Sequence, residues 1–172
     1  MKLLSMSSLG RLSRYLLILS SLFFADTATA NEQKLIMPQW QLNKQDGSEI
    51  GSADFQNNPL IVHFWATWCP YCKKLQPGLQ RLKDQYKSEG LEVIGVSFRE
   101  DPGTQPQTVL QNRGLDLLTA VDGESLASML SISGTPSTLF VYPSGEILGI
   151  TRTSDPKDPS LDKAVKILLG AK

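Results

Sequence analysis

Two cysteines three positions apart, Cys69 and Cys72, are the only thiols in the chain, and they separate two segments of different periodicity. Residues 60–65 read Leu-Ile-Val-His-Phe-Trp, a nearly all-apolar run typical of a buried central strand. From Cys69 to about Ser88, apolar residues recur at helical spacing. The pair therefore lies where a strand gives way to a helix N-terminus, whose free N–H groups and partial positive charge stabilise a thiolate on the first cysteine. This arrangement favours dithiol–disulfide exchange.

The cysteine pair has two other interpretations. A structural disulfide that closes so short a loop stabilises a fold by only about 2 kcal/mol, against about 4–5 kcal/mol for a loop of a hundred residues. A tetrahedral zinc site needs four ligands, and the sequence offers no second ligand pair. We therefore favour redox chemistry and predict no metal site. With no disulfide framework, the fold must depend on a hydrophobic core.

The first 30 residues are typical of an export signal. Basic residues precede a short apolar run at 15–25, and Ala28-Thr29-Ala30 offers a small-x-small cleavage pattern. The run is about half of the roughly 20 residues that a spanning helix needs, so an uncleaved membrane anchor is the second alternative. We predict a signal peptide over residues 1–30, a mature domain over residues 31–172, and a periplasmic location.

The predicted mature chain is nearly neutral. Its 142 residues carry 14 Lys and Arg against 16 Asp and Glu, without a basic cluster. Such a balance gives no electrostatic footprint for nucleic acid. The length suits one compact domain, and no repeat or low-complexity linker divides it.

The rest of the chain alternates between strand and helix patterns. Helix signals occur at 104–113, at 125–130 and after a predicted N-cap at Asp158, and Pro77 should kink the helix that follows the cysteines. Strand signals occur in a hairpin around Asp46-Gly47, at 91–98, at 117–121, and at 138–142 and 147–151 on either side of Pro143-Ser144-Gly145. This alternation predicts an α/β sheet covered on both faces.

With these elements placed, the chain resembles the thioredoxin superfamily, and within it the TlpA/ResA-like branch of exported thiol–disulfide oxidoreductases. The residues that carry the resemblance are the Trp-Ala-Thr-Trp-Cys-Pro-Tyr-Cys run at 65–72, Pro77, and Gly134-Thr135-Pro136 before a strand. The resemblance implies a thioredoxin-like α/β fold, with a mixed central sheet flanked by helices. It also implies an N-terminal β-hairpin around Trp40 and a central helix-strand insertion over residues 99–130.

The resemblance assigns roles to several residues. Cys69, exposed at the helix N-terminus, would attack a substrate disulfide, and Cys72 would resolve the mixed disulfide. Pro136 would follow a cis peptide bond and face the pair, leaving neighbouring backbone groups to bind an extended peptide; an ordinary trans turn is the alternative. The only redox group implied is the Cys69–Cys72 disulfide, with no cofactor.

Four residues around the pair are predicted to bind substrate. Trp68 is expected to be partly exposed on the substrate surface, whereas Trp65 is expected in the core. Pro70 and Tyr71 form the dipeptide between the cysteines, and Thr135 precedes the predicted cis-proline.

Two residues depart from the pattern of the branch. His63, the only histidine, stands where relatives of this kind carry Asp or Asn. It either relays the proton as Cys72 becomes a thiolate or is a neutral core residue. Leu75 stands where several reductases of the branch carry Glu, and it weakens an inference to cytochrome maturation.

We predict a monomeric reductase that acts on disulfides of exported proteins and is kept reduced by an inner-membrane electron donor. The first alternative is the same chemistry in the oxidising direction, which the sequence does not exclude. A peroxiredoxin-like peroxidase is a second alternative, although Ala66 stands where that class has Thr. A copper-binding protein is a third, although the cysteine spacing is one short and no histidine follows.

Overall fold

The computed structural model describes residues 34–170. The predicted signal peptide at residues 1–30 lies outside the described residues. None of the helices within residues 34–170 is long and apolar enough to cross a membrane.

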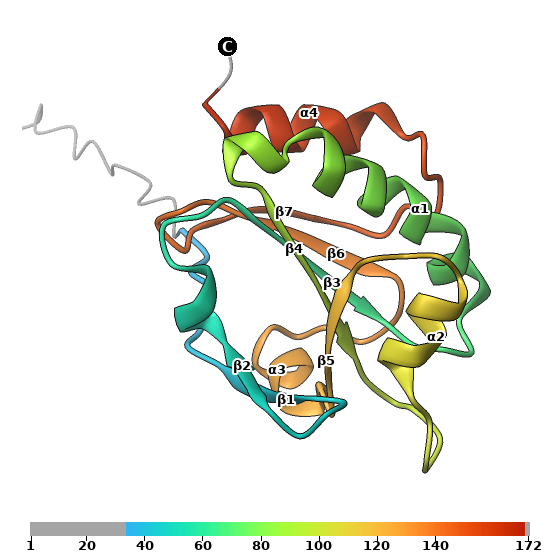
Figure 1. Cartoon of the computed structure of the whole chain (residues 1–172). Coiled ribbons are helices and arrows are strands. Elements are labelled where there is room, and N and C mark those ends of the chain that lie inside the picture. The colour runs from blue at the N-terminus through green and yellow to red at the C-terminus, as the bar shows by residue number, and fades with distance from the viewer. Residues whose placement is uncertain (1–33, 171–172) are drawn as a thin grey trace, which may run out of the picture. The chain divides into compact units, whose positions relative to one another are not determined.

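A seven-stranded mixed sheet forms the centre of the domain (Figure 1). Its order is β2-β1-β5-β4-β3-β6-β7, in which β3 pairs in parallel with β4, β4 pairs in parallel with β5, and every other pairing is antiparallel. The strands are β1 (Gln41–Lys44), β2 (Glu49–Gly51), β3 (Leu60–Trp65), β4 (Glu92–Ser97), β5 (Leu118–Val121), β6 (Ser137–Val141) and β7 (Ile147–Thr151).

Four α-helices cover this sheet. They are α1 (Pro70–Gln85), α2 (Pro106–Asn112), α3 (Glu124–Met129) and α4 (Pro159–Leu168), with short 3₁₀ turns η1 (Ser52–Phe55) and η2 (Lys87–Glu89). Helices α1 and α4 lie side by side over one face, and α3 lies on the opposite side (Figure 1). The hairpin β1–β2 joins the sheet through β5, and α2, β5 and α3 form the predicted central insertion.

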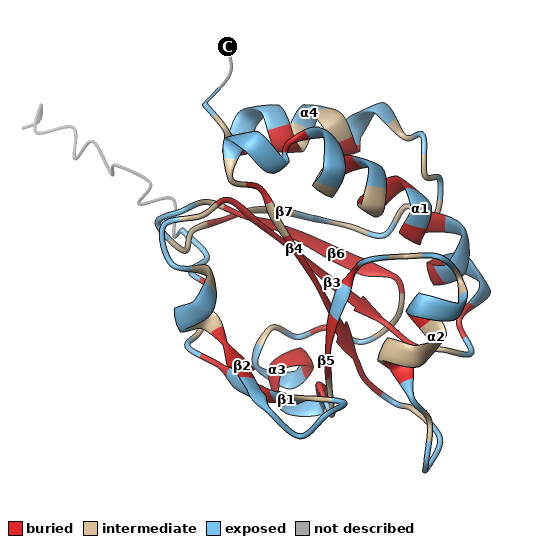
Figure 2. Cartoon of the chain, in the orientation of Figure 1, coloured by how far each residue is buried: buried red, intermediate tan, exposed pale blue. Residues whose placement is uncertain are grey.

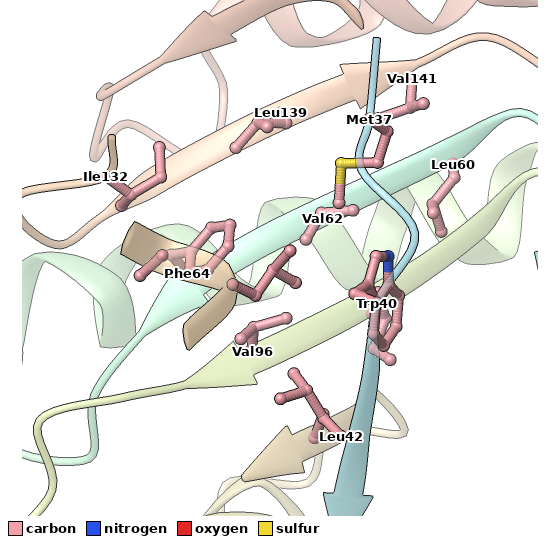
Figure 3. Close-up of a cluster of buried hydrophobic side chains, with 14 of the residues drawn as sticks. Met37, Trp40, Leu42, Leu60, Val62, Phe64, Val96, Ile132, Leu139 and Val141 are labelled. Carbon is pink, nitrogen blue, oxygen red and sulfur yellow. The ribbon is translucent and has the colours of Figure 1, made fainter. Parts of the chain in front are cut away.

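The alternation of side chains along β3 divides the core into two clusters. Val62 and Phe64 belong to the cluster shown in Figure 3, which includes Trp40 from the N-terminal segment. Ile61 and Trp65 point to the opposite face, where α1 and α4 pack. Because both faces of β3 and β4 are covered, these strands are almost entirely buried (Figure 2), which explains their predominantly apolar sequences.

The sequence-predicted elements are present, with ends shifted by at most a few residues. Pro77 lies inside α1, and Asp158 caps α4 by accepting a hydrogen bond from the Ser160 N–H at 2.9 Å. The two 3₁₀ turns and an isolated bridge between Ile36 and Glu146 were not predicted.

Candidate active site

Cys69 is the N-cap of α1. Its backbone is extended, and its sulfur accepts a hydrogen bond from the Cys72 N–H at 3.2 Å. Pro70 occupies the first helical position, where its missing N–H leaves no intrahelical bond unmade. Cys69 and Cys72 form a disulfide across the first turn. The first cysteine is thus at the N-terminus of the helix, as the sequence predicted.

The burial of Cys69 differs from the prediction. Its exposed fraction is 2%, and Cys72 is fully buried, so the exposed Cys69 implied by the resemblance is wrong for the disulfide state. The disulfide directs the Cys69 sulfur towards Cys72, and both lie in an apolar cluster with Trp65, Ala66 and Leu75. Little of the disulfide surface is therefore accessible to the thiol of a partner protein.

Exposed aromatic side chains flank the buried pair. Trp68 is 55% exposed and Tyr71 is 62% exposed. The Trp68 Nε1 donates to the Arg99 carbonyl at 2.8 Å, which holds the indole in the loop before α1. Trp65, by contrast, is buried and donates to Thr119 Oγ1 at 3.0 Å. The predicted difference in exposure between the two tryptophans is confirmed.

The Thr135–Pro136 peptide bond is cis, as the resemblance implied. Strand β6 begins at Ser137, which pairs with Phe64 near the end of β3. Because β3 leads on to Cys69, the cis-proline loop lies at the same end of the sheet as the cysteine pair. Thr135 is partly exposed and Pro136 is buried.

His63 is a buried, neutral side chain. Its Nδ1 lies 3.0 Å from Thr138 Oγ1 in the neighbouring strand, and its Nε2 has no hydrogen-bond partner among the described residues. Burial lowers the pKa of His63 from 6.5 to about 3, because a dry site disfavours the imidazolium. By strand alternation His63 shares the face of Ile61 and Trp65, which α1 covers.

A tight turn carries the chain from β3 into Cys69, and two charged residues hold it. The Cys69 N–H donates to the Ala66 carbonyl at 3.1 Å, which closes the turn. Glu100 accepts from the Thr67 N–H at 2.8 Å and from Thr67 Oγ1 at 2.6 Å. Arg113 donates to the Thr67 carbonyl at 3.1 Å. Both polar groups of the Thr67 backbone are therefore bound from outside the turn.

Arg113 and Glu100 are themselves fixed. The second guanidinium nitrogen of Arg113 donates to Gln76 Oε1 on α1 at 2.7 Å, and the guanidinium lies 5.7 Å from the centre of the Trp65 ring. Ser97 Oγ donates to Glu100 at 2.5 Å. Partial burial lowers the pKa of Arg113, and the charge of Glu100 acts in the opposite direction.

Glu100, Arg113 and Gln76 were not predicted from the sequence as part of the site. Glu100 follows an apolar strand and Arg113 ends a helix, which are ordinary places for charged residues. Only the packing of α2 beside α1 brings them to Thr67, so no local spacing identified them.

Leu75 is fully buried in the cluster around the cysteines. Within residues 34–170, no group of three or more His, Cys, Asp or Glu side chains is arranged to hold a metal ion.

A mixed sheet, a cysteine pair at a helix N-terminus and a cis-proline loop at the same end of the sheet define a thioredoxin-like thiol–disulfide oxidoreductase. The chain belongs to the AhpC/TSA family, whose sequence model matches residues 35–150.

Curated relatives carry the name of the same class of enzyme. The thiol-disulfide oxidoreductase ResA of Halalkalibacterium halodurans is 29% identical over 131 residues, which cover 74% of this chain and 72% of the relative. The ResA of Oceanobacillus iheyensis is 29% identical over 151 residues, which cover 80% and 77%.

Solved structures share the fold. A thiol:disulfide interchange protein of the thioredoxin family from Chlorobium tepidum superimposes with a TM-score of 0.69 at 23% identity, covering 82% of this chain and 100% of that one. A secreted Mycobacterium tuberculosis disulfide oxidoreductase homologous to DsbE of E. coli superimposes with a TM-score of 0.64 at 20% identity, covering 75% and 96%. The predicted thioredoxin-like fold is confirmed.

Proposed function

We propose that this protein is a periplasmic reductase that transfers electrons from the reduced Cys69/Cys72 pair to disulfides of exported proteins. The observation that carries the proposal is the redox pair at the N-cap of α1, flanked by the exposed rings of Trp68 and Tyr71. An apolar surface beside a reactive sulfur suits a protein substrate, because it binds an unfolded or extended segment while exchange takes place.

The reaction consists of two exchange steps. The Cys69 thiolate attacks one sulfur of a substrate disulfide, forms a mixed disulfide, and releases the other substrate sulfur as a thiolate that takes up a proton. The Cys72 thiolate then attacks the Cys69 sulfur, which restores the Cys69–Cys72 disulfide and releases the second substrate thiol. Two electrons pass from the protein to the substrate. The Cys72 N–H and the helix N-terminus stabilise the Cys69 thiolate.

The cis-proline loop supplies the backbone surface for substrate. Pro136 has no N–H, so the backbone groups next to it are left to pair with an extended substrate segment. Thr135 and Pro70 border this surface, and Trp68 and Tyr71 complete it.

His63 is proposed to accept the proton of Cys72 during the resolving step. Its side chain lies on the face of β3 that α1 covers, and its Nε2 is free to accept. The pKa of about 3 describes the disulfide state; a negative charge forming on Cys72, on the same side of β3, would favour the imidazolium. Replacing His63 with Asn should slow resolution of the mixed disulfide, and an unchanged rate across pH would contradict the role.

Export and partners complete the proposal. Residues 1–30 would be removed as a signal peptide, and the mature protein would act as a monomer, without a cofactor beyond its own disulfide. An inner-membrane electron donor would regenerate the dithiol, because an oxidising compartment does not keep a redox-active pair reduced.

Trapping of substrates tests the function directly. In Cys72→Ser, the resolving thiol is absent, so Cys69 should accumulate mixed disulfides with periplasmic proteins, which mass spectrometry identifies. Cys69→Ser is the matched control and should trap none. If the wild type does not reduce insulin and Cys72→Ser traps no protein, the proposal is wrong. A reduction potential close to that of strong oxidants, measured against glutathione, would favour the oxidising alternative, and peroxide consumption would favour a peroxidase.

A further inference from the structure

The turn that carries Cys69 is held at one residue, Thr67, by a pair of opposite charges. Residues 66–69 form a turn closed by the Cys69 N–H and the Ala66 carbonyl, so the Thr67 N–H and carbonyl take no part in closing it. Glu100 binds the N–H together with the hydroxyl, and Arg113 binds the carbonyl. Charge-assisted hydrogen bonds are shorter and stronger than neutral ones, so this pair fixes Thr67 firmly.

The same pair connects the turn to the rest of the site. Arg113 reaches Gln76 on α1, one turn after Cys72, and lies over Trp65 at the end of β3. The strand, the turn and the helix that present the disulfide therefore share one guanidinium. Glu100 is held by Ser97 at the end of β4. Neither Glu100 nor Arg113 forms a hydrogen bond with a cysteine among the described residues. Each instead binds Thr67.

The pair is also close to Cys69. Thr67 precedes Cys69 by two residues, and the two charged groups lie one hydrogen bond beyond Thr67. Because two residues of extended chain span at most about 7 Å, these charges lie on the order of 10 Å from Cys69. At such a separation one uncompensated charge changes the protonation equilibrium of a thiol measurably, even with partial solvent screening. With Glu100 and Arg113 both present, their fields largely cancel.

We propose that Glu100 and Arg113 are positioning residues that act through Thr67 to hold Cys69 at the helix N-terminus, and that their charges balance beside its thiol. This inference rests on the proposed function only in taking Cys69 as the reactive thiol.

Other charged side chains surround the turn but do not bind it. Glu124 of α3 accepts from the Arg99 N–H, and the Arg99 side chain donates to the Ser133 carbonyl. Asp101 is exposed, directly after Glu100. Further charged or titratable groups on neighbouring elements are Tyr71, Lys73 and Lys74 on the exposed side of α1, Arg152 after β7, and the buried neutral His63 in β3.

The test measures the pH profile of the reaction between the reduced protein and a small aromatic disulfide, which reports the Cys69 thiolate. Glu100→Gln leaves the Arg113 charge unbalanced, so the midpoint should move to lower pH. Arg113→Gln leaves the Glu100 charge unbalanced, so the midpoint should move to higher pH. At a fixed pH below the wild-type midpoint, the two rates should change in opposite directions, each by at least about threefold.

Three further variants separate charge from folding. The double variant Glu100→Gln/Arg113→Gln should return the midpoint towards wild type, because neither charge is then unbalanced. Arg113→Lys keeps the charge and should restore most of the midpoint. Asp101→Asn removes a carboxylate from the same loop without a contact to Thr67, and should leave the midpoint unchanged.

Thermal unfolding of each variant shows whether it is folded. If both single variants move the midpoint in the same direction, or if Asp101→Asn moves it as far as Glu100→Gln, the proposal is wrong and the pair is only structural. Opposite shifts, together with no insulin reduction by the wild type and no protein trapped by Cys72→Ser, would instead refute the proposed function and leave this inference standing.

Discussion

Protonation of His63 in the unfolded chain should contribute to acid destabilisation of the oxidised protein. Its imidazole has an ordinary pKa of 6.5 in the unfolded chain and about 3 when folded, because burial disfavours the charged ring. Between these pH values the unfolded chain holds a proton that the folded protein does not. Stability therefore rises with pH in this window and is lost as the pH falls.

The magnitude follows from the two pKa values. Integrated from neutral pH down to pH 4.5, the proton held only by the unfolded chain lowers the free energy of unfolding by about 3 kcal/mol. The whole separation of the two pKa values corresponds to about 5 kcal/mol, reached only below pH 3. Such an effect is large against the 5–15 kcal/mol that is roughly typical of a folded domain.

Denaturant unfolding of the oxidised wild type and of His63→Asn measures this effect. The amide of Asn can take the place of the His63 Nδ1 beside Thr138 but does not titrate. Between pH 7.5 and 4.5 the wild type should lose about 3 kcal/mol more than the variant. Carboxyl groups with lowered pKa, such as Asp162 beside Arg81, also reduce the free energy of unfolding in acid. Their contribution is the same in both proteins and cancels in the difference. Parallel curves for the two proteins would refute the reasoning.

Three other substitutions should change stability in stated directions. Gly78→Ala in α1 should destabilise by about 1–3 kcal/mol although Ala favours helices, because a Cβ there would lie 2.5 Å from the Pro156 carbonyl oxygen; a more stable variant in denaturant unfolding would contradict this. Arg81→Ala removes a two-pronged contact to Asp162 whose side chains are 41% and 30% exposed, so the loss should be below about 1 kcal/mol and should shrink in high salt; an equal loss in low and high salt would point to lost packing. Thr119→Val leaves the buried Trp65 Nε1 without its acceptor and should cost about 1–3 kcal/mol, seen in unfolding followed by tryptophan fluorescence; a neutral result would show that the indole finds another acceptor.

Features that depend on neighbouring residues were predictable from the sequence. The apolar run of β3 sets the strand at Leu60–Trp65, and the helical spacing after Cys69 sets α1. The N-cap position of Cys69 follows from Pro70, which suits the first turn of a helix. The cis bond before Pro136 was implied by resemblance alone.

Features that depend on packing were not predictable in this way. Glu100 and Arg113 are 33 and 46 residues from Thr67, and their contacts exist only once β4 and α2 are placed beside α1. The burial of Cys69 has the same origin, because it depends on the side chains that close over the disulfide and not on its place at a helix end. The sequence did not distinguish the two roles of His63, proton relay and neutral core residue, because both are compatible with its apolar neighbours.

The ends of the sheet have a consequence for how this protein meets other chains. β2 has only three residues and runs directly into η1. At the other end, the Ile147 N–H of β7 donates to the Leu35 carbonyl, and the Met37 N–H donates to the Gly145 carbonyl. A segment of the same chain thereby covers the start of the outer strand. Unpaired strand edges are templates for aggregation. Because this protein is proposed to bind extended substrate chains, its short or covered edge strands should limit β-sheet pairing with those chains.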